Sequence, residues 1–278
     1  MESIFCCPVC YDKMMIDEKT YRCKNNHCFD VARFGYVNLS KSQQSFKKRH
    51  GDDKLMVQAR SLFLSSGHYR PFADVIAEKC VKYCNNQTPT IIDIGCGEGY
   101  YTKRIYNSLS ENGYQAKLGG IDISKDALRY CKKAVQSGEY AVASAYHLPI
   151  ADNSCDILVN IFAPYSADEF NRVLKADGVV IRAFARKNHL LELKQAIYND
   201  VRDEDVEDLS LNGFDIVENV ELKYEIKLES NEEINNLFKM TPYYYKTSME
   251  SQKRLENIDN LSTTVSFSVV VYKKSDNN

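Results

Sequence analysis

Cysteine and histidine side chains crowd the first 28 residues in a spacing that suits a metal ion. Five of the ten cysteines lie there, in the runs CCPVC at 6–10 and CKNNHC at 23–28. Two thiolates separated by a tight turn can converge on one Zn²⁺ at about 2.3 Å. The intervening MMIDEKTYR can form a hairpin that brings the two pairs together. The pattern predicts a zinc ribbon, in which four filled positions make the site structural.

Spacing alone leaves two of the four ligands open. Cys6 would lengthen the spacing to the next cysteine of its pair from two residues to three, which favours Cys7. At the second pair, Cys23 is joined by either His27 or Cys28, with His27 slightly favoured. A reducing compartment would make disulfides among these thiols less favourable than metal binding.

A second group of residues suits a nucleotide-like cofactor. The β-branched run TIIDI at 90–94 predicts a buried parallel strand, GCGEG at 95–99 a tight turn, and 100–109 a helix. The next predicted strand ends at Asp122. Glycines after a first strand let the backbone approach a ligand closely, and an acidic residue closing the second strand accepts hydrogen bonds from ribose hydroxyls.

The glycine spacing distinguishes between cofactors. The run from Asp93 has the order D-x-G-x-G-x-G, which differs from the G-x-G-x-x-G of NAD enzymes. It resembles the first motif of class I S-adenosylmethionine (SAM) methyltransferases. Downstream, a loop precedes a predicted strand at 157–161, and RVLKADGVVI resembles the helix-to-strand passage of that superfamily. One departure is Ser144, where many such enzymes carry an aspartate for the adenine amine. The expected fold is α/β, a Rossmann-like doubly wound sheet.

Composition limits the function classes. The chain has 278 residues, 44% of them hydrophobic, and a formal net charge of −2, so a nucleic-acid surface would have to be a local patch. The densest basic run is KKRH at 47–50. No basic segment followed by an apolar run opens the chain, and no apolar stretch approaches bilayer length. These features predict a cytoplasmic protein with no membrane partner.

Three segments are expected. Residues 1–38 would form the zinc ribbon, 39–68 a basic linker with a helical connection, and 69–278 the methyltransferase domain. The strand-like runs at 214–228 and 263–274 would complete its sheet, and the helix and aromatic-rich turn between them would be an insertion.

Motifs along nearly the whole chain resemble the RlmA family, the 23S rRNA (guanine-N1)-methyltransferases. The similar runs are CPVC, CKNNHCFDVARFGYVNL, QAR-FL-GHYRP, DIGCGEGYYT, LPIADNSCD, KNHLLELKQAIYN and KMTPYYYK. The resemblance implies SAM as methyl donor, one structural zinc, a 23S rRNA hairpin as substrate and a homodimer.

The resemblance also implies functional residues. The zinc ligands would be Cys7, Cys10, Cys23 and His27, and the family's SAM site would use Tyr69, the turn Gly97–Gly99 and His189. With the glycine motif, the expected SAM-binding residues are Tyr69, Asp93, Gly95, Gly97, Glu98, Gly99, Tyr100, Asp122 and His189.

The methyl acceptor should lie beside the fourth strand of the fold. Guanine N1 carries a proton at neutral pH, and a base must be unpaired before an enzyme can reach it. Phe162 and Tyr165, in NIFAPY, are candidates for stacking on the base, and Asp168 is a candidate proton acceptor. Tyr243–Tyr245 are secondary candidates for RNA contact, as are Lys47–Arg49.

Two alternatives remain open on sequence. One is a SAM methyltransferase for a small molecule, with zinc only stabilising the fold. The other is a non-catalytic RNA-binding protein with a vestigial SAM site, which the intact glycine motif and Asp122 argue against.

Overall fold

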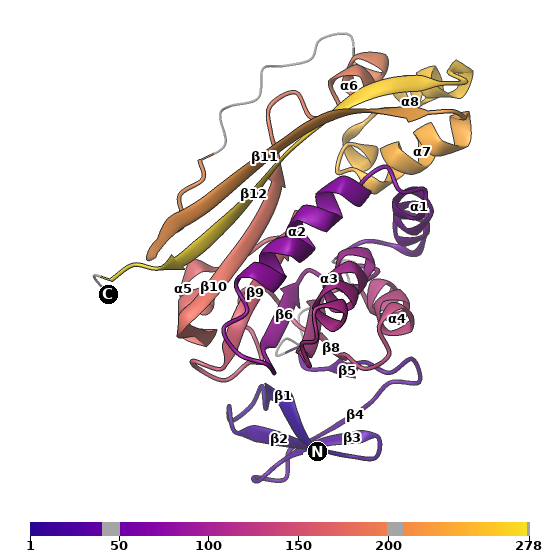
Figure 1. Cartoon of the computed structure of the whole chain (residues 1–278). Helices are drawn as coiled ribbons and strands as arrows, with labels where there is room; N and C mark the ends of the chain where they lie inside the picture. The colour runs from indigo at the N-terminus through magenta and orange to yellow at the C-terminus, as the bar shows by residue number, and fades with distance from the viewer. Residues whose placement is uncertain (41–50, 199–207, 277–278) are drawn as a thin grey trace.

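A small four-stranded sheet lies against a large eight-stranded one in the computed structural model, which describes residues 1–40, 51–198 and 208–276 (Figure 1). The small sheet is antiparallel, in the order β1-β2-β3-β4. Its strands are β1 (Glu2–Cys6), β2 (Lys13–Asp17), β3 (Thr20–Cys23) and β4 (Cys28–Asp30). The hairpin predicted between the two cysteine pairs is therefore β2–β3.

The large sheet has the order β11-β12-β10-β9-β6-β7-β8-β5. The pairs from β10 to β5 are parallel, and β12 and β11 add an antiparallel edge. The strands are β5 (Val37–Asn38), β6 (Thr90–Ile94), β7 (Lys117–Asp122), β8 (Glu139–Val142), β9 (Cys155–Ile161), β10 (Leu174–Ala185), β11 (Phe214–Leu228) and β12 (Leu261–Lys274). The predicted doubly wound sheet is confirmed.

Helices and short 3₁₀ turns connect these strands. They are α1 (Lys54–Ser65), α2 (Arg70–Lys82), α3 (Tyr100–Glu111), α4 (Lys125–Ala134), α5 (Ala167–Val173), α6 (Leu191–Ile197), α7 (Asn231–Met240), η1 (Tyr244–Lys246), α8 (Met249–Lys253) and η2 (Arg254–Asn257). In α2 the buried residues Phe72, Ile76 and Cys80 recur at helical spacing and pack in the core. Ser124 caps α4 by accepting a hydrogen bond from the Ala127 N–H at 3.2 Å. None of the helices in the described ranges has both the length and the hydrophobicity needed to cross a membrane.

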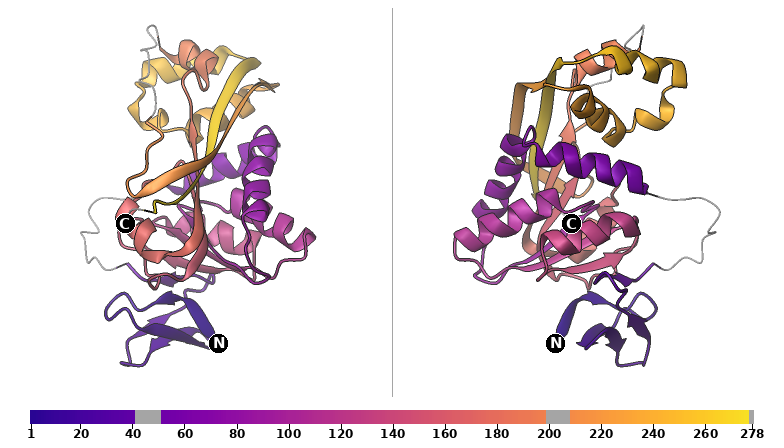
Figure 2. Two further views of the ribbon diagram at one scale, coloured as in Figure 1. Left: turned by 60° about the vertical axis from the view of Figure 1, so that its left-hand side comes forward. Right: turned by 90° about the vertical axis from the view of Figure 1, so that its right-hand side faces the viewer.

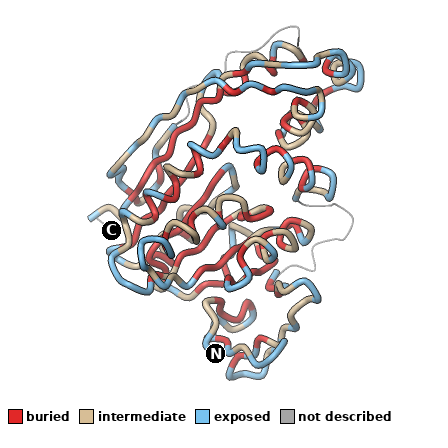
Figure 3. The backbone as a smooth tube through the Cα atoms, turned by 45° about the vertical axis from the view of Figure 1, so that its right-hand side comes forward, coloured by how far each residue is buried: buried red, intermediate tan, exposed pale blue. Residues whose placement is uncertain are grey.

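The small N-terminal sheet, the predicted ribbon, shares a core with the large sheet. Phe5 and Met14, both almost completely buried, belong to one hydrophobic cluster with Ile92 and Ile94 of β6. Figure 3 shows buried segments of backbone in the N-terminal sheet as well as along the strands of the large sheet. The two sheets are also joined through the backbone, since β5 follows the ribbon and pairs in parallel with β8 at the edge of the large sheet. The ribbon is therefore packed against the sheet as part of one folded unit.

Polar contacts and a glycine fix the position of the ribbon. The Ser3 hydroxyl donates to the Glu139 carboxylate at 2.6 Å, and the Tyr21 hydroxyl donates to the same group at 3.3 Å. Gly119 of β7 leaves room for Ile4, because a Cβ there would lie 2.3 Å from Ile4 Cδ1. A larger residue at position 119 would push the ribbon away from the sheet.

The C-terminal hairpin reaches away from the ribbon. Strands β11 and β12 extend to the opposite end of the molecule, where α6, α7 and α8 gather (Figure 2). The insertion between the strands contacts α1, since Arg60 Nη2 donates to the Met240 carbonyl at 3.3 Å and the Tyr245 hydroxyl donates to Asp53 at 2.7 Å. It therefore holds α1 over the carboxyl edge of the sheet.

Candidate functional site

Four side chains of the ribbon converge as ligands of one metal ion would. Cys10 Sγ and Cys23 Sγ are 3.7 Å apart, and His27 Nδ1 lies 3.5 Å from Cys7 Sγ and 3.4 Å from Cys23 Sγ. All four ligand atoms lie within 4.8 Å of one another. With Zn–S near 2.3 Å and Zn–N near 2.0–2.1 Å, a tetrahedral site requires edges of about 3.8 and 3.6 Å. The cluster therefore fits a four-coordinate zinc.

The two cysteines that spacing left as alternatives lie outside this cluster. Cys6 is buried beneath the ribbon, and its backbone N–H donates to the Pro149 carbonyl at 2.8 Å. Cys28 is exposed, and its thiol donates to the Asn26 carbonyl at 3.3 Å. The structure thus brings together the set that the family resemblance implies.

The surroundings of the thiols differ. The Asn25 side chain, with backbone hydrogen bonding from Asp12, lowers the pKa of Cys10 to about 7, while burial raises the pKa of Cys7 to about 11. Cys10 is thus more readily available than Cys7 as thiolate, the form that binds zinc.

The glycine turn and Asp122 form one hydrogen-bonded unit at the carboxyl edge of β6 and β7. Gly95, Gly97 and Gly99 all have positive φ, at 78°, 54° and 90°, which glycine adopts without steric cost. The Gly97 N–H donates to one Asp122 carboxylate oxygen at 2.9 Å, and the Ser124 N–H donates to the other at 2.7 Å. Burial raises the pKa of Asp122, and these N–H groups counteract that effect.

Asp93 supports the turn from beneath. It is almost completely buried, and it accepts a hydrogen bond from the Thr102 hydroxyl of α3 at 2.5 Å. Burial raises its pKa to about 7. Its side chain ties β6 to α3, so its role in the structure is to hold the glycine turn.

Two charged residues that the sequence did not single out are Arg60 of α1 and Asp52, which precedes the N-cap of that helix. Arg60 forms an ion pair with Asp52. The charge of Asp52 raises the pKa of Asp122, and the charge of Arg60 lowers it. Arg60 Nη1 also lies 3.9 Å from where a Cβ on Gly97 would be. The QAR run was noticed only as a family motif, and the fold gives its arginine a place above the glycine turn.

Tyr69 and His189 meet although 120 residues separate them. Tyr69 Oη lies 3.4 Å from His189 Nε2, and the Ser266 N–H donates to His189 Nδ1 at 3.2 Å. Burial lowers the pKa of His189 to about 3, so the ring is neutral at pH 7. With Nδ1 accepting, the ring proton resides on Nε2. Phe267 packs against both rings, at 5.0 and 4.7 Å between centroids.

The loop after β9 presents an aromatic ring at the same edge. Asn160 Nδ2 donates to the carbonyls of Ile94 and Pro164, at 3.3 Å each, and so fixes the loop to β6. Phe162 has φ of +53°, a strained value for a non-glycine residue. The residue is 48% exposed, and its ring stacks on Phe72. This geometry leaves a free aromatic surface beside the glycine turn.

The remaining acceptor candidates lie apart from Phe162. Tyr165 stacks on Phe170 of α5, at 5.7 Å, on the other face of the sheet. Asp168 is exposed in the first turn of α5 and forms no hydrogen bond or ion pair with the described residues of the loop. Tyr243–Tyr245 are near α1, and Lys47–Arg49 fall outside the described residues.

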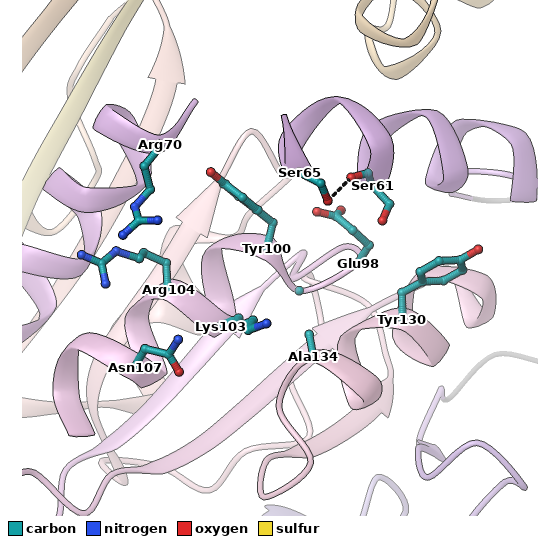
Figure 4. A pocket seen from close by; sticks show the side chains of 11 residues that line it. Ser61, Ser65, Arg70, Glu98, Tyr100, Lys103, Arg104, Asn107, Tyr130 and Ala134 are labelled. Carbon is teal, nitrogen blue, oxygen red and sulfur yellow. Dashed lines mark hydrogen bonds between the residues drawn. The ribbon is translucent and has the colours of Figure 1, made fainter. Parts of the chain in front are cut away.

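The side chains of Glu98 and Tyr100 lie in a pocket at the start of α3. They line a pocket of about 400 Å³ between α1, α3 and α4, with Arg70, Lys103 and Arg104 (Figure 4). Burial raises the pKa of Glu98, and its Oε1 has no hydrogen-bond partner. Their backbone belongs to the glycine turn and the start of α3, and their side chains line this pocket.

Comparison with known proteins matches both parts of the chain. The zinc-ribbon family described as "RlmA, N-terminal" matches residues 5–45, and the family described as "Methyltransferase domain" matches residues 92–182. The methyl donor of this enzyme class, SAM, and a structural zinc are thus the cofactors of the fold.

Curated relatives extend the match to full length. A Bacillus subtilis protein, YxjB, named as a candidate 23S rRNA (guanine-N1)-methyltransferase, is 31% identical over 98% of both chains. The 23S rRNA (guanine(748)-N1)-methyltransferase of Streptomyces fradiae is 33% identical over 69% of this chain and 66% of its own length. A malonyl-[acyl-carrier protein] O-methyltransferase of Hahella chejuensis is 30% identical over 62% of this chain and 63% of its own. Since one of these likenesses spans the ribbon and the whole methyltransferase part, the chain belongs to the RlmA family of methyltransferases.

Proposed function

We propose that this enzyme transfers the methyl group of SAM to N1 of one guanine in a 23S rRNA hairpin loop. The observation that carries the proposal is the exposed, strained Phe162 at the end of β9, beside the glycine turn. Strain of this kind persists where the surrounding structure enforces it, and it marks functional sites. The names of the two RlmA-type relatives support the choice of acceptor.

The SAM site would be built on the edge of β6 and β7. Asp122 would accept hydrogen bonds from the ribose, and the backbone of Gly95–Gly99 would approach the cofactor. Tyr69, the N-cap of α2, and His189, in the loop after β10, would also contact it. Asp93 would act by holding the turn. Glu98 and Tyr100 would contribute through their backbone.

The methyl donor needs little activation, whereas the acceptor nitrogen must be positioned and must lose a proton. The methyl group on the SAM sulfonium is already electrophilic, so the enzyme must align N1 with it and allow the N1 proton to leave. Phe162 would hold the unpaired base by stacking, which contributes roughly 1–3 kcal/mol per base. The ribbon, with zinc held by Cys7, Cys10, Cys23 and His27, would contact another part of the hairpin.

The proposal is tested by incubating the full chain with SAM and a 23S rRNA transcript. N1 methylation blocks Watson–Crick pairing, so reverse transcriptase should stop at one guanine, and mass analysis should find N1-methylguanine there. If rRNA gives no stop while a carboxylic acid or thioester substrate is methylated, the small-molecule alternative, which the Hahella relative represents, replaces this proposal. SAM binding without any product would favour the non-catalytic alternative.

Removal of the Asp122 carboxylate should weaken SAM binding. A hydrogen bond to a charged group contributes roughly 1.5–3 kcal/mol, so Asp122→Ala should raise the Kd for SAM about ten- to a hundredfold in calorimetry. Asp177→Ala removes an exposed carboxylate near the start of β10 and is the matched control. Equal SAM affinity in both variants would mean that another residue binds the ribose.

Three further assignments complete the proposal. The segment boundaries at residues 38 and 68 stay predictions, and the ribbon packs on the large sheet. An rRNA substrate would place the enzyme in the cytoplasm. The homodimer implied by the family stays a prediction, which light scattering on the purified chain would check.

A further inference from the structure

Arg182 is a charged residue in the middle of an apolar strand. It lies in β10 within the run VVIRAF, it is 8% exposed, and its neighbours Ile181 and Ala183 point into the opposite core. Its backbone is in register with Asn160 of β9. Arginine is seldom buried without a partner, so its surroundings need an explanation.

The guanidinium has aromatic neighbours and no anion. Its Cζ lies 3.8 Å from the centroid of the Tyr165 ring and 5.5 Å from that of Phe184, and its Nε has no hydrogen-bond partner. It forms no ion pair with any carboxylate in the described ranges. Arg172, by contrast, is paired with Glu169 at 2.8 Å. A buried cation without an anion is unfavourable, which points to a ligand that supplies negative charge.

The place of the guanidinium indicates which ligand. Tyr165 belongs to the loop that follows β9, the same loop that presents Phe162, and Asn160 fixes that loop by its bonds to Ile94 and Pro164. Arg182 thus packs against the loop that would hold the methyl acceptor, from the face of the sheet that Tyr165 covers. Its planar fork of N–H donors matches the O6 edge of guanine, the commonest arginine–base contact.

We propose that Arg182 is a catalytic residue whose guanidinium donates hydrogen bonds to O6 of the acceptor guanine and stabilises the negative charge that forms there. The inference rests on the proposed function.

The N1–H bond breaks with its proton passing to water, and the charge left on the base is shared between N1 and O6. The N1 lone pair then bonds to the methyl carbon. The carbon–sulfur bond of SAM breaks with its electron pair staying on sulfur, which gives S-adenosylhomocysteine, and O6 becomes a neutral carbonyl again. Arg182 keeps its protons throughout.

Arg182→Met separates this role from a structural one. Methionine fills a similar volume without charge, so the variant should keep or exceed the wild-type Tm and should bind SAM normally. Its kcat on the rRNA transcript should fall about 100- to 1,000-fold, as when a preorganised oxyanion donor is removed. The rate should also rise with pH over a higher range than in the wild type, because the base must then lose its proton without help.

Three comparisons complete the experiment. Arg186→Met removes a partly exposed arginine that directly follows β10 and forms an ion pair with Glu221. This variant should leave kcat and the pH profile nearly unchanged. A wild-type kcat in Arg182→Met, or a lowered Tm together with reduced SAM binding, would overturn the proposal. Weaker RNA binding with a flatter salt dependence and unchanged kcat would instead assign Arg182 to an RNA phosphate. If the wild type itself forms no N1-methylguanine, the proposed function is wrong. That result does not depend on the Arg182 variants, so the two failures can be told apart.

Discussion

Cys10→Ser should release the zinc and unfold the ribbon. Structural Zn²⁺ contributes about 10–16 kcal/mol of apparent binding free energy to small zinc domains, and that energy is folding energy. Zinc content should fall from about one per chain to a small fraction, and the amides of β2 and β3 should lose protection from hydrogen exchange. Because Phe5 and Met14 pack on β6, the Tm of the whole chain should fall as well.

The matched control is Cys28→Ser. Cys28 neighbours His27 in sequence but lies exposed outside the cluster, so that variant should keep zinc and Tm. SAM binding by Cys10→Ser, measured well below its Tm, should persist, since Asp122 lies at the edge of the sheet with the glycine turn. Full zinc occupancy in Cys10→Ser would remove Cys10 from the ligand set.

Gly95→Ala should abolish methyl transfer almost completely. Gly95 has φ of +78°, where a side chain costs roughly 1–2 kcal/mol, and a Cβ there would lie 2.3 Å from the Cβ of Ala163. Ala163 follows the strained Phe162, so the acceptor loop must move. A misplacement of about 1 Å can cost about a hundredfold in rate, and kcat/KM should fall by at least that much.

Two variants distinguish the clash from the backbone strain. Ala163→Gly added to Gly95→Ala removes the clashing atom and should restore part of the rate. Gly113→Ala imposes the same kind of strain, at φ of +82° with nothing within 4 Å, and should lower Tm without a direct effect on the site. If the double variant is as inactive as Gly95→Ala alone, the loop contact is not the cause.

Local patterns in the sequence predicted the parts of the site that neighbouring residues determine. The strand 90–94, the turn after it and the end of the next strand at Asp122 all stand where the pattern placed them. The strand at 214–228 was also predicted with its observed bounds. In each case, β-branched residues within the strand and glycines beside it are sufficient to define the element.

Contacts between distant segments were not predictable in this way. Nothing local indicates that Arg60 lies above Gly97, or that Ile4 fits against Gly119. The signal for Arg182 was present, as a lone charge in an apolar strand. Its meaning depends on its contact with Tyr165 and on the lack of an ion pair with any carboxylate of the described residues. Glu98 was predicted from its place in the glycine motif to contact the cofactor; its side chain lines the pocket between α1, α3 and α4, and the contact stays a prediction.

The pairing of β5 with β8 sets an order for folding during synthesis. All four zinc-cluster residues are made within the first 27 residues, so the ribbon can take up zinc while most of the chain is still untranslated. Its docking surface comes much later, since Val37 pairs with Ala141 and Ser3 bonds to Glu139. Chains grow at about 5–20 residues per second, which leaves the ribbon with Phe5 and Met14 exposed for several seconds. Bound zinc would thus keep the ribbon folded until the large sheet has been synthesised and covers Phe5 and Met14.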